Sequence, residues 1–183
     1  MIFIPSSVPP HKVTEKVIGA EHRLEMVRLA TRSNSHFSTS DVEISRPGKS
    51  YSIDTIRFFR EQGLAALFFI LGSDAFVEIE TWKECQNLFS LCDFIVMARP
   101  GAQKNSFSLP IPKALTPSFQ YDQRENVWVH LSGHLLYFKE ISFLDISSTR
   151  VRELIEKGRS ARYLIPDQVE AYVQSLGLYR GNP

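Results

Sequence analysis

The sequence predicts a mixed α/β fold in which a mostly parallel sheet carries helices on both faces. Short continuous apolar runs recur along the chain, for example at residues 67–71 and 94–97, and such runs are typical of parallel strands buried on both faces. Longer helical stretches separate these runs, and strands that alternate with helices predict βαβ units. With 183 residues, the chain is expected to form a single domain over residues 1–183.

The predicted elements follow from these patterns in chain order. Strands are expected at residues 2–4, 42–44, 67–71, 94–97, 127–131 and 136–141. Helices are expected at residues 21–32, 52–62, 148–157 and 166–175. Ser52 is expected to cap the second helix, and a glycine follows each of the last three: Gly63, Gly158 and Gly177. Residues 99–126 hold several prolines among serines and lysines, so we expect a long excursion over the surface, a kind of loop that is often functional.

Charge and composition exclude several classes of function. The 21 basic and 20 acidic side chains nearly balance, giving a formal net charge of +1, which disfavours nucleic acid or a membrane surface as the partner. No apolar run approaches the ~18 residues that a membrane-spanning helix needs, and residues 1–5 lack the pattern of a signal peptide. Cys85 and Cys92 form no CxxC motif, so we expect two small buried side chains in a helical stretch of a cytoplasmic protein.

Polar residues follow the ends of several predicted strands. They stand at residues 9–12 (PPHK), 72–74 (GSD), 99–101 (RPG) and 145–152 (DISSTRVR). Because the carboxyl ends of parallel strands share one edge, and helix N-termini there attract anions, we expect these residues to gather at one rim and bind a phosphate-bearing nucleotide. Arg150 and Arg152 strengthen this expectation, since a helix start disfavours cations unless an anion is bound beside them.

Each of these segments also has a purely structural interpretation. Residues 147–149 could do no more than cap a helix, and residues 72–74 could be a simple strand-to-helix turn. Trp82 could belong to the core. His130 and His134 have HxxxH spacing, but Gly133 lies between them, so a metal site is not favoured. The sequence contains no G-x-S-x-G, Walker or G-x-G-x-x-G motif, which leaves serine hydrolysis, P-loop chemistry and a standard dinucleotide fingerprint unsupported.

A series of motifs resembles one enzyme family over nearly the whole chain. The motifs are PPHK (9–12), HR (22–23), SYSIDT (50–55), LGSDAFVEIETW (71–82), ARPG (98–101), ISSTRVR (146–152) and YLIPDQVEAYVQSLGLY (163–179). In order and spacing they resemble the bacterial nicotinate-nucleotide adenylyltransferases of the nucleotidyltransferase superfamily, whose fold is Rossmann-like. The resemblance implies transfer of AMP from ATP to nicotinate mononucleotide, giving deamido-NAD and pyrophosphate in NAD biosynthesis, with Mg²⁺ accompanying ATP.

The resemblance also implies roles for individual residues. Ser147, Ser148 and Arg152 match the motif that holds the ATP phosphates and carries catalysis, and Thr149 lies within the same motif. Three further positions match the recognition of nicotinate mononucleotide: Asp74 near both nucleotides, Ser52 in place of a threonine that reads the nicotinate carboxylate, and Trp82 stacked on the pyridine ring. Lys12 and Arg99 match cations on the phosphate side. No side chain is expected to hold a metal ion by itself.

The chain departs from the family pattern at its start. The family opens with a strand and a G-x-F-x-P-x-H-x-G-H segment whose histidines contact ATP phosphates, whereas this sequence begins at what resembles the second strand. We therefore expect a chain that is truncated at its N-terminus and lacks the first, central strand of the family's sheet. We also expect it to be a poor enzyme as it stands, because loss of one phosphate donor can lower the rate by ~10²–10³. Two alternatives stay open, namely a related nucleotidyltransferase that uses nicotinamide mononucleotide or a phosphopantetheine acceptor, and a non-catalytic nucleotide-binding fragment. Homo-oligomer formation also stays open.

Overall fold

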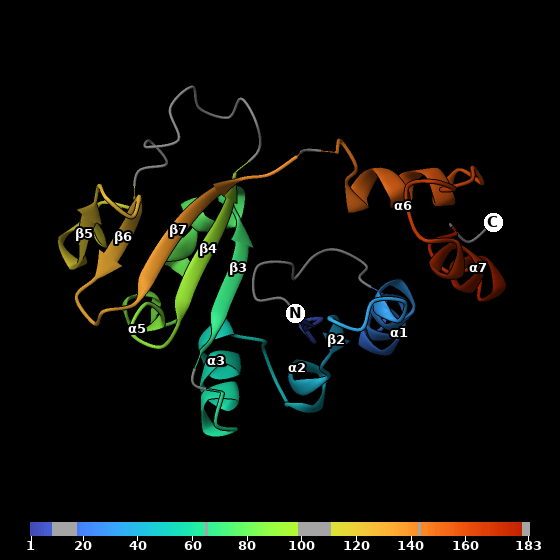
Figure 1. Ribbon diagram of the computed structural model, residues 1–183. Coiled ribbons are helices and arrows are strands. Elements are labelled where there is room, and N and C mark those ends of the chain that lie inside the picture. The colour runs from blue at the N-terminus through green and yellow to red at the C-terminus, as the bar shows by residue number, and fades with distance from the viewer. Residues whose placement is uncertain (9–17, 65, 99–110, 143, 181–183) are drawn as a thin grey trace. The chain divides into compact units, whose positions relative to one another are not determined.

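A computed structural model describes residues 1–8, 18–64, 66–98, 111–142 and 144–180 (Figure 1). The chain divides into two compact units. Unit 1 comprises Met1–Ser50 and Leu144–Pro183, and unit 2 comprises Tyr51–Phe143. A single domain over residues 1–183 stays a prediction.

Unit 1 combines a two-stranded sheet with helices from both ends of the chain. Strand β1 (Ile2–Phe3) pairs in parallel with β2 (Ser38–Thr39). The helices are α1 (Ala20–Thr31), α2 (Val42–Ser45), α6 (Ser148–Glu156) and α7 (Asp167–Ser175). Helices α1 and α7 pack together, joined by a 2.9 Å hydrogen bond between His22 Nδ1 and the Tyr172 hydroxyl. Among the residues of this unit that the structure describes, the buried apolar side chains are Leu24, Ala161, Val169 and Val173.

Unit 2 is built around a five-stranded sheet with the order β3-β4-β7-β6-β5. Strands β3 (Phe68–Gly72), β4 (Asp93–Ala98) and β7 (Leu135–Glu140) are parallel, while β6 (Val127–His130) and β5 (Phe119–Asp122) add as antiparallel neighbours. Helix α3 (Ser52–Glu61) precedes β3, and helices α4 (Ser73–Val77) and α5 (Cys85–Leu88) lie between β3 and β4. Two short 3₁₀ turns, η1 (Ile79–Thr81) and η2 (Thr116–Ser118), complete the unit.

The core of unit 2 explains why these residues form these strands. The segments predicted as strands supply Phe94 and Val96 from β4 and Leu136 from β7, and all three side chains are fully buried. Burial on both faces, predicted for the apolar run 67–71, is wrong for β3, where Phe68 and Ile70 are exposed. Phe76 and Phe89, from α4 and the turn after α5, complete an aromatic-rich cluster. The fold class is therefore confirmed as mixed α/β with a largely parallel central sheet.

Two local predictions are wrong. Residues 42–44 form helix α2 rather than a strand, and the strand lies earlier, at β2. The β-branched side chains of this segment favour a strand only where a pleated surface accepts them, and here the segment starts a helical turn after Asp41. Ser52 is not a helix cap, because Tyr51 occupies the N-cap of α3 and no side chain caps that helix.

The prediction of a surface excursion over residues 99–126 is also wrong for its described part. Residues 99–110 lie outside the described residues, but Ile111 and Leu115 are buried in the core, and β5 joins the sheet. Phe119 of β5 packs edge-on against Phe89 with ring centroids 5.1 Å apart. The many prolines of this stretch indicate a loop, and the four-residue strand β5 is too short to stand out against them.

The cysteines do not share a helix. Cys85 begins α5 and is half-buried, whereas Cys92 lies beyond that helix, just before β4, and is buried. Burial raises the pKa of the Cys92 thiol to about 12. Within the described ranges, no helix combines the length and the apolar character needed to cross a membrane.

Candidate functional site

The start of helix α6 in unit 1 presents hydrogen-bond donors. Ser147 is the N-cap with an extended backbone, and its Oγ accepts a 3.2 Å hydrogen bond from the Arg150 N–H. Helix geometry leaves the N–H groups of Ser148 and Thr149 without an intrahelical acceptor. The first turn of α6 contains no acidic residue, so these donors and the helix dipole together favour an anion.

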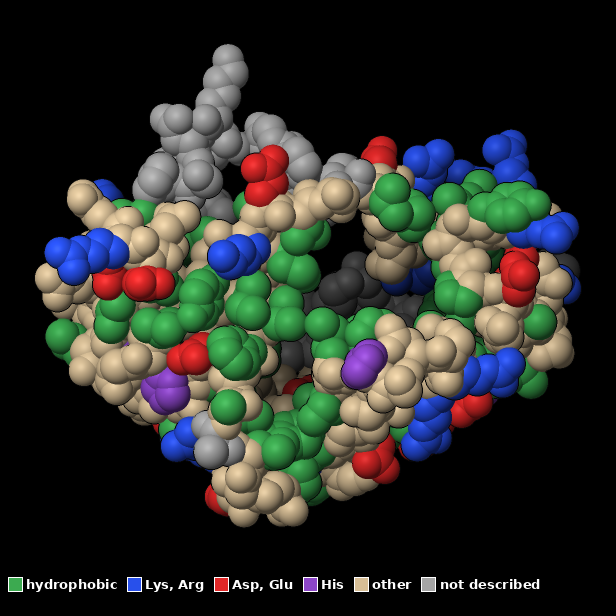
Figure 2. Space-filling model, in the orientation of Figure 1, with side chains coloured by type: hydrophobic (Ala, Val, Ile, Leu, Met, Phe, Trp, Pro, Cys, Tyr) green, Lys and Arg blue, Asp and Glu red, His purple; other side chains and the backbone are tan. Residues whose placement is uncertain are grey.

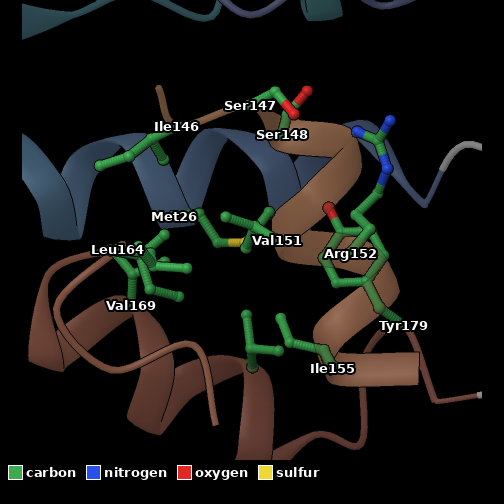
Figure 3. A pocket seen from close by; sticks show the side chains of 12 residues that line it. Met26, Ile146, Ser147, Ser148, Val151, Arg152, Ile155, Leu164, Val169 and Tyr179 are labelled. Carbon is green, nitrogen blue, oxygen red and sulfur yellow. The ribbon is translucent and has the colours of Figure 1, made fainter. Parts of the chain in front are cut away.

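Arg152 adds a cation to this helix start. Its side chain is half-buried, and its Nη2 donates a 3.2 Å hydrogen bond to Thr149 Oγ1 one turn earlier. Figure 3 shows the guanidinium at the same end of α6 as the hydroxyls of Ser147 and Ser148. Helical side chains lean towards the N-terminus, which brings a residue at this position back to the first turn. Arg152, Ser147 and Ser148 thus lie at one helix end, and their joint binding of an anion stays a prediction.

A cavity of about 210 Å³ lies beside these groups in unit 1 (Figure 3). Its wall is largely aliphatic, with Met26, Val151 and Val169 among its lining residues, while Arg152 and the α6 start supply polar atoms. Tyr179 also lines it, and burial raises the pKa of its hydroxyl, an effect that the positive charge of Arg152 partly offsets. The Tyr179 hydroxyl is therefore neutral and can donate a hydrogen bond near neutral pH.

The HR motif at residues 22–23 has a structural role within unit 1. Arg23 donates hydrogen bonds to the carbonyl oxygens of Ser6, Ser7 and Ile18, and so fixes the segments that follow β1 and precede α1. Burial lowers the pKa of Arg23, which still leaves the guanidinium charged. The motif supports the backbone around the α1 start.

Two of the predicted pyridine-binding residues lie on neighbouring segments of unit 2. Ser52 is the first residue of α3, and Trp82 follows the turn η1. Lys83 links the segments, because its Nζ lies 3.0 Å from Asp54 Oδ2 in the first turn of α3 and 4.8 Å from the centroid of the Tyr51 ring. Trp82 is half-buried and meets Phe69 edge-on, with ring centroids 6.0 Å apart.

The remaining predicted residues lie either in unit 2 or outside the described residues. Asp74 is exposed in the first turn of α4, directly after β3. Lys12 and Arg99 lie outside the described residues. Because Asp74, Ser52 and Trp82 belong to unit 2, and the α6 residues to unit 1, the gathering of all of them at one rim stays a prediction.

An ionic cluster beside Trp82 was not predicted from the sequence. The Arg57 guanidinium of α3 donates hydrogen bonds of 3.1 and 2.6 Å to the two carboxylate oxygens of Glu84, and these bonds lower the pKa of Glu84 to about 2. Glu84 has a left-handed backbone, with φ 53° and ψ 43°. The i,i+3 spacing of Asp54 and Arg57 was a visible signal, but nothing in the sequence marks the partner segment.

The two histidines near the β6–β7 turn have local partners in unit 2. His134 Nδ1 lies 2.9 Å from Asp93 Oδ1, and His130 Nδ1 lies 2.8 Å from Ser132 Oγ. Burial, and to a lesser degree the neighbouring His134, lowers the pKa of His130. Among the described residues, no group of three or more His, Cys, Asp or Glu side chains is arranged to hold a metal ion.

Comparisons with known proteins agree with the motif pattern. The family model described as cytidylyltransferase-like matches residues 1–154. A relative from a Geobacter species is 46% identical over 98% of this chain and 83% of its own length, and one from Geobacter sulfurreducens is 43% identical over the same shares. Both carry the name "Probable nicotinate-nucleotide adenylyltransferase".

A solved structure shares the fold. The Plasmodium falciparum nicotinic acid mononucleotide adenylyltransferase, complexed with NaAD, matches with a TM-score of 0.65 and 19% identity, over 97% of this chain and 81% of that one. At this identity the match bears on the fold alone. The family-model match and the identity to relatives over nearly the whole chain show that this chain belongs to the nicotinate-nucleotide adenylyltransferase family of cytidylyltransferase-like enzymes.

Proposed function

We propose that this chain transfers the adenylyl group of ATP to nicotinate mononucleotide, forming deamido-NAD and pyrophosphate. The observation that carries the proposal is the start of α6, where free N–H groups, two serine hydroxyls and Arg152 converge without an opposing carboxylate in the first turn. Such an arrangement complements a polyphosphate. The names of the relatives support nicotinate mononucleotide as the acceptor. A cytoplasmic location is a further proposal, based on the free cysteines.

The proposed reaction needs no covalent bond to the protein. A phosphate oxygen of nicotinate mononucleotide attacks the α-phosphorus of ATP in line, and the bond to the bridging oxygen breaks. Pyrophosphate leaves with that electron pair. Arg152, the hydroxyls of Ser147, Ser148 and Thr149, and the first amides of α6 hold the phosphates in place and neutralise the charge that develops on the leaving group.

Unit 2 would bind the pyridine nucleotide. The Ser52 hydroxyl and the first-turn amides of α3 are suitable donors for the nicotinate carboxylate, and Trp82 offers an aromatic surface for the pyridine ring. Asp74, at the start of α4, would accept hydrogen bonds from a bound nucleotide. Lys12 and Arg99 are retained as cations for the phosphate of nicotinate mononucleotide, on the strength of the motif resemblance.

Magnesium is proposed to arrive as part of the substrate, bound to the phosphates of ATP. Mg²⁺ retains several waters and usually binds through substrate phosphates with few protein carboxylates. Arg152 and the α6 amides would share the neutralisation of the polyphosphate with the ion.

A comparison of acceptors tests the proposed function. Pyrophosphate release from magnesium-ATP is measured with nicotinate mononucleotide, nicotinamide mononucleotide and phosphopantetheine in parallel. The proposal expects the highest kcat/KM with nicotinate mononucleotide. Preference for either other acceptor would identify a related nucleotidyltransferase, and binding of ATP without turnover of any acceptor would support a non-catalytic fragment.

Substitution of Trp82 tests the pyridine contact. Stacking of a base on an aromatic ring contributes ~1–3 kcal/mol, so Trp82→Ala is expected to raise the KM for nicotinate mononucleotide about 5- to 160-fold. The KM for ATP is expected to change little. Equal weakening of both substrates would instead make Trp82 a packing residue of the core, in line with its contact to Phe69.

A further inference from the structure

We propose that Lys83 and Asp54 are positioning residues that hold Trp82 against the start of α3 and thereby set the affinity for nicotinate mononucleotide. The proposal rests on the proposed function, because it assumes that Trp82 stacks on the pyridine ring. It adds a role for two charged side chains that contact each other across two segments of unit 2.

Lys83 is held by α3 on two sides. Its Nζ donates hydrogen bonds of 3.1 and 3.0 Å to both carboxylate oxygens of Asp54. The same ammonium group lies 4.8 Å from the centroid of the Tyr51 ring, within the range of a cation–π contact. A lysine that contacts two residues of one helix start has few other conformations, so the backbone that carries it is restrained as well.

The residue after Lys83 is fixed in the same way. Glu84 adopts a left-handed backbone conformation that is unfavourable for a residue with a Cβ, and such a conformation persists where its surroundings determine it. The surroundings are the paired hydrogen bonds from Arg57 of α3 and a 3.0 Å bond from Asn87 Nδ2. The two residues that follow Trp82 are thus both tied to α3.

Trp82 is therefore restrained from two directions. On one side its ring meets Phe69 of β3, and the backbone N–H of Trp82 donates a 3.0 Å hydrogen bond to the Ile79 carbonyl oxygen. On the other side, Lys83 fixes the following peptide relative to α3, whose first residue is Ser52. The ion pair determines how far the indole lies from the helix start proposed to read the nicotinate carboxylate.

The charge of Lys83 could also act directly on an anionic ligand, and one substitution separates the two roles. If the ammonium contacts the ligand, Asp54→Asn frees it from its present partner and removes a negative charge, so binding stays equal or becomes tighter. If Lys83 acts by holding Trp82, Asp54→Asn breaks the restraint and binding becomes weaker. The sign of the change is therefore decisive.

The experiment measures nicotinate mononucleotide binding through the fluorescence of Trp82, in a Trp128→Phe background that leaves one tryptophan. Lys83→Met and Asp54→Asn are each expected to raise the Kd about three- to fivefold, because exposed ion pairs couple modestly. The double variant is expected to be no weaker than either single one, and Lys83→Arg should recover most of the affinity. Acrylamide quenching of Trp82 should increase in both single variants without ligand.

Controls distinguish a positioning role from a general loss of structure. Arg28→Met removes an exposed ion pair with Glu25 in unit 1 and is expected to leave the Kd for nicotinate mononucleotide unchanged. Affinity for ATP should stay the same in every variant. Tighter or unchanged binding in Asp54→Asn overturns the positioning role alone. If the wild-type chain does not bind nicotinate mononucleotide, the proposed function is overturned, and this inference with it.

Discussion

Removal of the Arg152 guanidinium tests the phosphate-binding role of α6. Arg152 makes one described hydrogen bond, to Thr149, which leaves its remaining N–H groups available for a ligand at the same helix end. A hydrogen bond to a charged group contributes ~1.5–3 kcal/mol. Since 1.36 kcal/mol corresponds to tenfold in rate, Arg152→Ala is expected to lower kcat/KM for ATP by about 10- to 150-fold.

The assay is pyrophosphate release at varied ATP and saturating nicotinate mononucleotide. Arg150→Ala is the matched control, because Arg150 is an exposed arginine in the same turn and only its backbone N–H takes part in the cap. This variant should lose clearly less kcat/KM than Arg152→Ala, because the exposed Arg150 charge is screened by solvent and would attract the phosphates only weakly. Because the positive charge of Arg152 lowers the pKa of Tyr179, Arg152→Ala should also raise that pKa further, which NMR titration can follow. Undiminished kcat/KM in Arg152→Ala, or an equal loss in Arg150→Ala, would refute the reasoning.

Three further predictions concern unit 2. Arg57→Met should raise the pKa of Glu84 from about 2 towards 4.5. Wild type should therefore be more stable than the variant near neutral pH, and this difference should vanish as the pH falls towards 2. Carboxyl NMR and urea titration measure both effects, and an unchanged pKa would contradict the prediction. Cys92, whose thiol pKa is raised to about 12, should react with iodoacetamide at pH 8 far more slowly than Cys85, as peptide mass mapping would show; equal rates would count against its burial. Leu115→Ala should destabilise the fold by ~2–5 kcal/mol in urea unfolding, while Leu131→Ala, at an exposed position, should change it little; equal effects would contradict the core assignment.

The sequence predicted elements best where one residue pattern determines them. The apolar runs at β3 and β4 were placed within one residue, because β-branched and aromatic runs favour strands. Their burial was less predictable, since Phe68 and Ile70 of β3 are exposed. Gly158 and Gly177 have positive φ after α6 and α7, as expected for residues that end helices. By contrast, α2 and β5 are only four residues long each, and β5 follows a proline-rich stretch, so neither leaves a period long enough to identify it.

The residues of the candidate site were predictable from the sequence, but the contacts that hold Trp82 in place were not. The serines at the start of α6 were visible because a hydroxyl-rich helix start with arginines is unusual in charge. The contact between Lys83 and Asp54 joins residues 29 positions apart, and the left-handed backbone of Glu84 has no signature in its residue type. Such contacts depend on how α3 packs on the segment after η1, which the sequence does not reveal.

The fate of the α-phosphate of ATP tests the proposed reaction most directly. The protein is incubated with magnesium-ATP labelled at the α-phosphorus and with nicotinate mononucleotide, and the products are separated and counted. Adenylyl transfer predicts that the label moves into the dinucleotide while pyrophosphate is released unlabelled in equal amount. Label found only in free AMP, or retained in ATP while nicotinate mononucleotide is bound, would contradict it.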